Sequence, residues 1–496
     1  MKLAKRLGLP GAVRGTISGL ASVLLAAGAP FGLFTTRERA DAFMLPGDEK
    51  FSFDPGTGWT AGFAKAVLTP DDAGKKTYWL AGYQANNPAR GVLDDMYARA
   101  IYLDDNTGRG GVVLCAVDCV GLSRRDVNEI REKVIGSGRI PGVRSILICS
   151  THTHSAVDTQ GLWGPSIVRD GKDKAFQNRL KERTAGAIVA SYEARKDGRL
   201  FLGTADVGDM LADIRTPVEF DPALTRLRFQ PSDGSPGVYV VHMGCHPELL
   251  GSHTTCISAD FPAYMGRELA SRTGADFLFL NGAIGGQISA FGIRSIHRDP
   301  DGDCERFMKD FGRRVAERVL AVENEREAAP LVNVRSQGVR LEGENPVFRL
   351  GKLFGVVNND LEKVPRRLKT YVLTEVSYME LGDRQLGLFM LPGEIYYEFY
   401  SGRFMDAASS ANGFAADYKP FSHMTDCERG LIVGLCCDAL GYIIPDNDYY
   451  LHAWLGHLET ARDRFDRSHY EETNSVGRNE ARALVDAMDA LTKSVR

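Results

Sequence analysis

Two closely spaced histidines follow an apolar run in the first third of the chain. His152 and His154 lie in THTHS, directly after SILICS. Side chains alternate between the two faces of a strand, so we expect both imidazoles on the same side, at the end of a buried strand. Imidazole binds divalent metals and transfers protons near neutral pH. The pair therefore predicts a metal site or an acid–base pair, and two loop histidines bonded to backbone are the structural alternative.

A second group of histidines, His242, His246 and His253, occurs in VYVVHMGCHPELLGSHTTC. His246 stands at the predicted exit of the VYVV strand, a position that suits a ligand better than core packing. A catalytic zinc needs about three protein ligands and an open position for water, so a further donor should come from another part of the chain. Glu394 is the candidate, because it follows the apolar run LGLFM and precedes a predicted helix. The alternative is a first-turn glutamate favoured by the helix dipole.

Two aspartates near these groups have two interpretations. Asp118 ends the apolar run GVVLCAV, and Asp260 lies in ISADFP. Each predicts either a carboxylate that orients a metal-binding imidazole or an ordinary cap or turn residue.

The segments that must position these groups alternate between strand and helix patterns. Predicted strands cover residues 97–105, 111–118, 144–151, 226–231, 237–244, 276–282 and 331–341, and predicted helices cover 124–136, 175–195 and 479–494. Strands interleaved with amphipathic helices indicate an α/β fold with a helical C-terminus. No internal repeat or low-complexity tract interrupts the pattern.

The composition is that of an ordinary folded protein. The chain has 496 residues, of which 44% are hydrophobic and 25% are charged, with 60 Lys and Arg against 64 Asp and Glu. These values exclude a mostly disordered chain, and the near balance of charge offers no basic surface for nucleic acid. The nine cysteines are too sparse for a disulfide scaffold and include no CxxC pair.

The N-terminal 40 residues read as a leader. Basic residues precede the uncharged stretch TISGLASVLLAAGAPFGLFTT, a pattern typical of a secretory signal peptide. The stretch is also nearly long enough to span a bilayer, so an uncleaved membrane anchor is the close alternative, and an amphipathic helix of a cytosolic protein is the third. Residues 41–60 are rich in turn formers and predict a linker. We therefore expect an exported body of residues 61–496, either secreted or membrane-anchored.

Six motifs in the same order carry a family resemblance. AGFAKAVLTP, GYQANNPARGVLDDMYARAIYLDD, THTHS, VHMGCHP, LPGE and ALGYIIP together resemble the neutral/alkaline non-lysosomal ceramidases, from about residue 62 to residue 494. Each motif alone is weak, but their shared order is fairly specific. The resemblance implies a single large mixed-sheet α/β sandwich that forms a ceramidase-like zinc hydrolase domain over residues 61–496.

The resemblance also implies a set of site residues. In that family two histidines, a glutamate and a tyrosine hold zinc, and these correspond here to His152, His246, Glu394 and Tyr442. His154 would transfer a proton or contact the substrate. Arg215, in ADIRTP, would stabilise an oxyanion or a carboxylate product, and Tyr470, in HYEETNSVG, would be an active-site tyrosine.

The chain departs from the family at the proposed nucleophile, a serine in a Gly-Asp-Val-Ser-Pro-like turn. In the matching segment FLFLNGAIGGQISAFG, Gly286 stands where an acidic residue is common, Ile288 where the serine is expected, and Ser289 one place later. Either the turn is shifted and Ser289 is the nucleophile, or this chain uses none. We favour the second, because a shift of one residue redirects the hydroxyl. Val476 replaces a second late tyrosine, and we expect no C-terminal β-sandwich.

Three hypotheses follow. The first is a zinc-dependent ceramidase-like amidase that cleaves a ceramide-like lipid amide with a metal-activated water. The second is a metal hydrolase of the same fold that acts on another amide, an ester or a sugar-derived substrate, which the missing serine favours. The third is a metal-stabilised surface protein without turnover. A metallophosphatase is a weaker alternative, because its dense Asp, Asn and His signature is absent. The expected partner is a small-molecule or lipid amide, with membrane association through the leader and no nucleic acid.

Overall fold

The computed structural model describes residues 43–166, 169–290, 303–345, 359–364, 369–451 and 462–496. The predicted leader, residues 1–40, lies outside the described residues. Within these ranges, no helix has both the length and the apolar character needed to cross a bilayer.

Two mixed β-sheets form the centre of the molecule. The larger sheet has nine strands in the order β10-β8-β7-β6-β1-β3-β4-β5, with β11 paired to β6. Its strands are β1 (Trp59–Val67), β3 (Tyr97–Asp104), β4 (Val112–Val117), β5 (Ser145–Ser150), β6 (Lys196–Asp206), β7 (Ala223–Pro231), β8 (Val238–Met243), β10 (Asp276–Asn281) and β11 (Arg326–Glu327). The pairs β8/β10 and β4/β5 are parallel and the others antiparallel.

The smaller sheet has five strands in the order β12-β14-β15-β17, with β13 paired to β14. Its strands are β12 (Val332–Glu342), β13 (Leu361–Val364), β14 (Lys369–Leu381), β15 (Leu386–Met390) and β17 (Arg429–Val433). Two short parallel pairs lie outside both sheets: β2 (Gly91–Val92) with β9 (Cys256–Ile257), and β16 (Glu394–Ile395) with β18 (Tyr442–Ile443).

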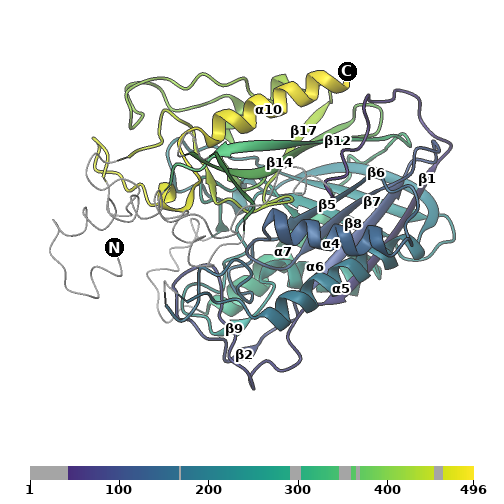
Figure 1. Cartoon of the computed structure of the whole chain (residues 1–496). Coiled ribbons are helices and arrows are strands. Elements are labelled where there is room, and N and C mark those ends of the chain that lie inside the picture. Colours follow the sequence, from purple (N-terminus) through teal and green to yellow (C-terminus); the bar gives the residue numbers. More distant parts are fainter. Residues whose placement is uncertain (1–42, 167–168, 291–302, 346–358, 365–368, 452–461) are drawn as a thin grey trace.

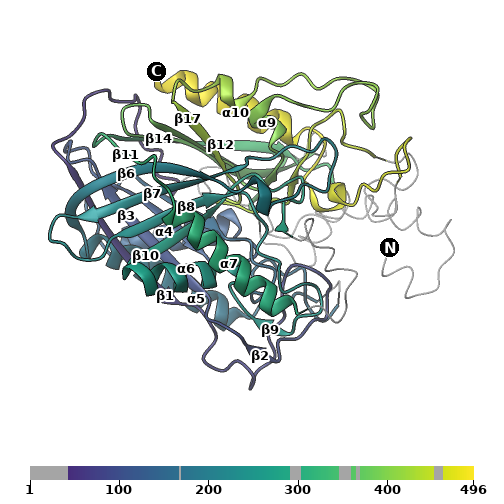
Figure 2. The same ribbon diagram turned by 180° about the vertical axis from the view of Figure 1, so that it is seen from behind.

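Helices cover the outer faces of both sheets (Figures 1 and 2). Helices α4 (Arg124–Gly136), α5 (Lys174–Glu193), α6 (Phe261–Thr273) and α7 (Cys304–Leu320) lie on the side of the larger sheet, and α10 (Glu480–Val495) lies over β12 and β14. The short α9 (Glu398–Ser401) follows β16. One buried core contains side chains of both sheets, among them Leu114 of β4 and Met379 of β14. The sheets therefore pack as one sandwich.

The sequence predictions of fold class are confirmed. The mixed α/β architecture and the C-terminal helix are both present, and α4 has the predicted bounds. Ser123 caps α4 by accepting a hydrogen bond from the Asp126 backbone, the usual role of a serine at that position.

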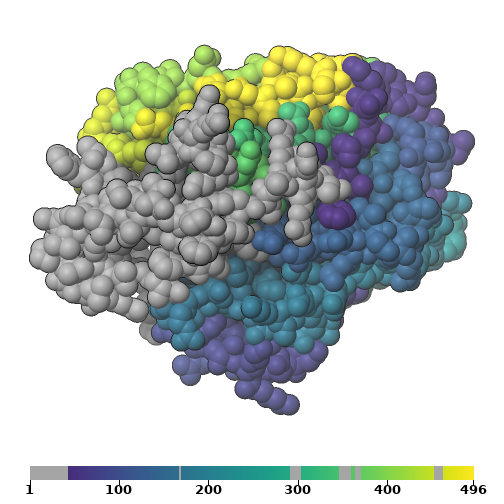
Figure 3. All heavy atoms as spheres, in the orientation of Figure 1, coloured from purple at the N-terminus to yellow at the C-terminus, as the bar shows by residue number. Residues whose placement is uncertain are grey.

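Residues 43–58, within the predicted linker, are packed against the body. Phe51 is buried and its amide donates to the carbonyl of Val495 at 2.9 Å. Asp48 pairs with Arg144 at 2.7 Å. Figure 3 shows the early, purple part of the described chain running up to the yellow C-terminal helix. The turn-rich composition predicts irregular backbone here, but it does not reveal that the two ends of the described chain stabilise each other.

Two helical glycines offer a matched test of this packing. A Cβ on Gly266 of α6 would lie 1.7 Å from Cε1 of Phe277, whereas a Cβ on Gly186 of α5 would meet open space. We expect Gly266→Ala to lower the free energy of unfolding by about 1–3 kcal/mol through overpacking. We expect Gly186→Ala to raise it by up to about 1 kcal/mol through helix propensity. Urea unfolding of both variants checks this, and equal effects at the two positions would contradict the packing of α6 on β10.

Candidate metal centre

His152 lies two residues beyond the end of β5, in a left-handed backbone conformation with φ of 68°. The predicted strand alternation therefore does not orient its ring. The backbone does so instead: the amide of His152 donates to Cys119 at 2.9 Å, and ring Nδ1 lies 2.6 Å from the carbonyl of Val120. Because a carbonyl only accepts, Nδ1 carries the proton and Nε2 presents its lone pair. Such backbone strain in a non-glycine residue is typical of functional sites.

His246 follows β8 and is oriented in the same way. Its amide donates to the carbonyl of Ile288 at 2.9 Å, and its ring Nδ1 lies 3.1 Å from the same oxygen. Its Nε2 is therefore the free nitrogen. A backbone carbonyl that accepts from Nδ1 is a common way to fix the tautomer of a metal-binding histidine.

Glu394 brings one carboxylate oxygen to both free nitrogens. Oε2 lies 3.4 Å from Nε2 of His152 and 3.3 Å from Nε2 of His246. Burial alone raises the pKa of the Glu394 carboxyl, but the positive charges and hydrogen bonds that His152 and His246 supply when their Nε2 atoms are protonated outweigh it and hold that pKa well below its ordinary value. When both Nε2 atoms are unprotonated, they and Glu394 Oε2 are three lone-pair atoms that face one another, and they need a shared proton or a cation between them. Two imidazole nitrogens and a carboxylate oxygen are ligands that suit a divalent metal.

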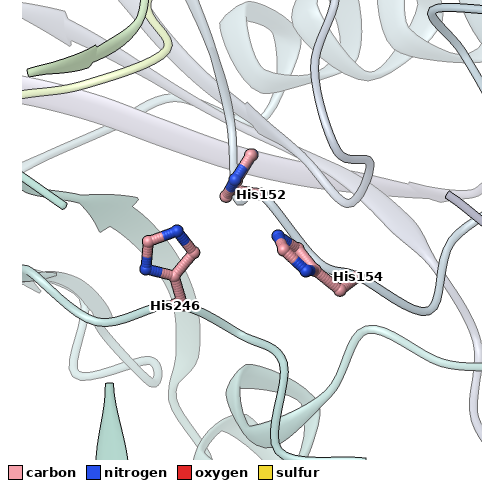
Figure 4. Close-up of side chains that lie close together, drawn as sticks. All are labelled: His152, His154 and His246. Carbon is pink, nitrogen blue, oxygen red and sulfur yellow. The ribbon is translucent and has the colours of Figure 1, made fainter. Parts of the chain in front are cut away.

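His154 completes a group of three imidazoles (Figure 4). The ring centroids lie 4.8 Å (His152–His154), 5.2 Å (His152–His246) and 5.6 Å (His154–His246) apart, and the ligand atoms lie within 4.8 Å of one another. Burial, and then the two neighbouring histidines, lowers the pKa of His154 well below its ordinary value, so its ring is neutral. Among the described residues, neither ring nitrogen of His154 has a hydrogen-bond partner. Buried polar atoms left in this state indicate a missing ligand.

Other residues hold His154 in place. Tyr83 packs edge-on against its ring at 5.1 Å and donates to the Glu248 carboxylate at 3.1 Å. A Cβ on Gly82, whose φ is +114°, would lie 2.5 Å from the Cβ of His154, so only glycine fits there. The sequence analysis missed Tyr83 and Glu248. Glu248 could have been selected from the sequence, because it stands two residues after the candidate ligand His246.

Tyr442 is brought to Glu394 by strand pairing. The two residues are register partners in the parallel pair β16/β18, and the amide of Glu394 donates to the carbonyl of Gly441 at 2.8 Å. The hydroxyl of Tyr442 lies 3.0 Å from that of Tyr470. Burial, and then the charge of Glu394, raises the pKa of Tyr442 well above its ordinary value, so the phenol stays neutral unless a cation lies beside it.

Arg215 lies behind the tyrosines. It pairs with Glu471 at 2.9 Å and donates to the carbonyl of Ser468 at 3.3 Å. The side-chain amide of Gln287 contacts Tyr470 and lies 3.0 Å from Glu471. Gln287 and Glu471 are site residues that the sequence analysis missed, and Glu471 had a signal, since it stands next to Tyr470.

The turn that carries the expected nucleophile is built differently here. The Ile288 side chain is buried in an apolar cluster, and the Ser289 backbone pairs with Ala212 at 3.0 Å in both directions. These two hydrogen bonds hold the main chain of Ser289 in place at the edge of the site. A Cβ on Gly286 would lie 2.8 Å from both carboxylate oxygens of Asp213. The Asp213 carboxylate therefore lies directly beside the position where an acidic residue is expected.

Four further candidates lie outside the histidine group. His242 bonds the carbonyl of Ile432 at 2.6 Å and so links β8 to β17, and His253 is exposed. Asp118 pairs with Arg99 at 2.6 Å. Asp260 caps α6 through the amide of Phe261, and burial raises its pKa to about 7. Asp260 is therefore the cap residue of its alternative interpretation, whereas Asp118 is half of a buried ion pair rather than a cap.

Asn281, at the end of β10, joins the two histidine segments. Its Nδ2 donates to the carbonyl of Thr151 at 3.1 Å, and its Oδ1 accepts from the amide of Cys245 at 3.1 Å. One fully buried side chain therefore holds the residue before His152 and the residue before His246 in register. The pattern FLFLNG predicts a strand end but not this bridge.

The fold and the site define an α/β sandwich with a buried histidine centre at the ends of its strands. Among solved structures, the chain is similar to the crystal structure of neutral ceramidase from Pseudomonas aeruginosa, with a TM-score of 0.65 and 16% identity over 88% of this chain and 74% of that one. It is similarly close to a ceramidase complexed with C2, with a TM-score of 0.65 and 15% identity over 89% and 76% of the two chains. No protein-family model and no curated protein matches the sequence. The chain therefore has the neutral ceramidase fold, which confirms the resemblance seen in the motifs.

Proposed function

We propose that this protein is a zinc-dependent amide hydrolase that cleaves the N-acyl bond of a ceramide-like lipid into a fatty acid and a sphingoid base. The observation that carries the proposal is the convergence of His152, His154, His246 and Glu394 in a chain with the neutral ceramidase fold. We assign His152, His246, Glu394 and Tyr442 as the zinc donors, with His154 in reach of the same position.

The side chains divide the chemistry among them. Zinc bound there would lower the pKa of a water molecule toward ~7 and polarise the scissile carbonyl. His152 and His246 keep their protons on Nδ1 and offer Nε2, and Glu394 supplies the negative charge. Neutral His154 can accept a proton at the ring nitrogen that its tautomer leaves unprotonated. Tyr470 can donate to a developing oxyanion, with Arg215 behind it.

A second candidate is a hydrolase of the same fold that acts on a different amide or ester. The turn at Gly286–Ser289 favours it, because an amide side chain, Gln287, rather than a hydroxyl, reaches the tyrosines there. Water would be the nucleophile in this candidate as in the first, and the backbone of Ser289 holds the turn against Ala212.

We also propose export of the protein, on the basis of the N-terminal sequence described above. A secreted or anchored enzyme would meet lipid amides at a membrane surface, which agrees with the proposed substrate.

The test uses the full chain, purified and analysed for bound zinc. Fluorescent ceramide in detergent micelles and a panel of other N-acyl amides and esters are offered to zinc-loaded protein, to chelator-treated protein, and to treated protein after zinc is restored. We expect release of fatty acid from ceramide that chelation abolishes and zinc restores. Turnover of another amide or ester alone would favour the second candidate, and zinc-loaded protein inactive on all of them would contradict both.

A further inference from the structure

Two buried cysteines face each other at the edge of the larger sheet. Cys149 lies in β5, the last strand in the order of that sheet, and Cys436 pairs with it in an antiparallel bridge. Both side chains are buried, and both are free thiols in the structure. The two thiols are hydrogen-bonded to each other. Their sulfur atoms are therefore neighbours, although the residues stand in the first and last thirds of the chain.

The backbone hydrogen bonds show what kind of pair this is. The amide of Ser150 donates to the carbonyl of Leu435 at 3.0 Å, and the amide of Cys437 donates to the carbonyl of Ile148 at 2.7 Å. These bonds join the residues on either side of the two cysteines, so the cysteines form a non-hydrogen-bonded pair. In such a pair the Cα atoms are about 4.5 Å apart and the side chains lie close together. A disulfide needs Cα atoms about 4.4–6.8 Å apart, so the backbone spacing fits one.

Cys437 is the competing partner, because its sulfur lies 3.6 Å from that of Cys436. Adjacent Cα atoms across a trans peptide are about 3.8 Å apart, which is shorter than a disulfide normally allows. The Cys437 thiol also has another partner, since Nη2 of Arg131 lies 3.1 Å from its sulfur. The geometry therefore favours the pair across the two segments over the pair of adjacent residues.

We propose that Cys149 and Cys436 form a disulfide in the exported protein, and that this bond stabilises the junction between two segments of the candidate site. Cys149 stands three residues before His152, and Cys436 stands six residues before Tyr442. The proposal goes beyond the proposed hydrolysis and does not depend on zinc or on the substrate. It uses the proposed export only for the oxidising compartment, where disulfides form and persist.

The step needs a disulfide oxidant, such as oxidised glutathione. The thiolate of one cysteine attacks the S–S bond of the oxidant, forms a mixed disulfide and releases one reduced thiol. The thiolate of the other cysteine then attacks the mixed disulfide and releases the second. The cysteine pair loses two electrons and two protons, and the oxidant gains both.

Both thiols stay protonated in the folded protein. The hydrogen bond to Cys149, together with burial, raises the pKa of Cys436 well above its ordinary value. The same hydrogen bond lowers the pKa of Cys149, but burial and the neighbouring thiols raise it by more. Because the thiolate is the attacking species, we expect the bond to form while the chain folds or opens locally, before the edge of β5 is covered.

The test identifies the cross-link by peptide mapping. The full chain is reduced and unfolded in urea, refolded in a buffer of reduced and oxidised glutathione, and alkylated before digestion and mass spectrometry. We expect a peptide in which Cys149 is joined to Cys436, with Cys437 alkylated. The oxidised protein should melt about 5 °C or more above the reduced protein, because the bond closes a long loop of the unfolded chain.

Three variants separate the pair from its neighbours. Cys436→Ser should lose both the cross-linked peptide and the difference in melting temperature between oxidised and reduced protein. Cys437→Ser should keep both. Cys115→Ser is the matched control, since Cys115 is a buried free thiol on the neighbouring strand β4, and it should also keep both.

A second procedure covers a chain that does not refold. The native reduced protein is held with oxidised glutathione in urea at the start of its unfolding transition, where local opening admits the oxidant. In either procedure, Cys149 and Cys436 recovered without a bond between them, or Cys436 joined to Cys437, would overturn the proposal. A cross-linked protein that melts no higher than the reduced form would overturn it too. Because no step measures zinc or turnover, these outcomes are separate from a failure of the proposed function.

Discussion

His246→Ala is expected to lose zinc binding and hydrolytic activity together. The substitution removes the Nε2 that lies 3.3 Å from Glu394 and one of the three converging imidazoles. Metal-ion catalysis supplies several kcal/mol of transition-state stabilisation, and each 1.36 kcal/mol is tenfold in rate, so activity should fall by about a thousandfold or more. Zinc affinity should fall by more than the roughly 100-fold seen for outer-shell changes. Chelator competition and the ceramide assay measure the two effects.

The matched control is His253→Ala. His253 follows His246 in the same segment but is exposed and lies outside the histidine group. It should leave both zinc affinity and activity close to wild type. Equal losses in the two variants, or zinc binding retained in His246→Ala, would contradict the assignment of His246 as a ligand.

Glu375→Gln is expected to cause the largest loss of stability. Glu375, in β14, is buried between two guanidinium groups: Oε1 lies 2.7 Å from Arg131, and Oε2 lies 3.3 Å from Arg124. Removing the carboxylate leaves two buried positive charges without their counter-ion, which typically costs about 3–5 kcal/mol. Urea unfolding at neutral pH measures the loss. The exposed pair of Glu327 and Arg199 provides the control, and Glu327→Gln should change stability by less than about 1 kcal/mol.

The same carboxyl predicts a dependence on pH. Burial raises the pKa of Glu375, but the charges and hydrogen bonds of Arg131 and then Arg124 lower it by more than burial raises it. The pKa of Glu375 in the folded protein therefore lies below the ordinary value of 4.5. A group with a lowered folded pKa contributes its stability above the unfolded pKa and loses it as the pH falls through the folded pKa. The gap in stability between wild type and Glu375→Gln should therefore narrow below pH 4.5. A gap that stays constant through acid pH would contradict the ion pair.

Local sequence patterns were sufficient for most of the fold. The apolar runs that became β4, β5, β8 and β10, and the helix of residues 124–136 with its Ser123 cap, follow from periodicity and capping, which act over a few residues. Local patterns could not predict how residues 43–58 pack, because Phe51 is hydrogen-bonded to Val495, which is more than 400 residues away in the sequence.

The candidate site divides in the same way. His152, His154 and His246 could be selected from the sequence because each stands at the exit of a recognisable strand, and Glu394 because it follows another. Their convergence around Glu394, the bridge by Asn281 and the contacts of Gln287 could not be predicted, because they depend on which strand ends meet in the folded sandwich. Residue types and strand exits are local properties of a chain. Distances between segments that are far apart in the sequence are set only when the two sheets pack around a common core.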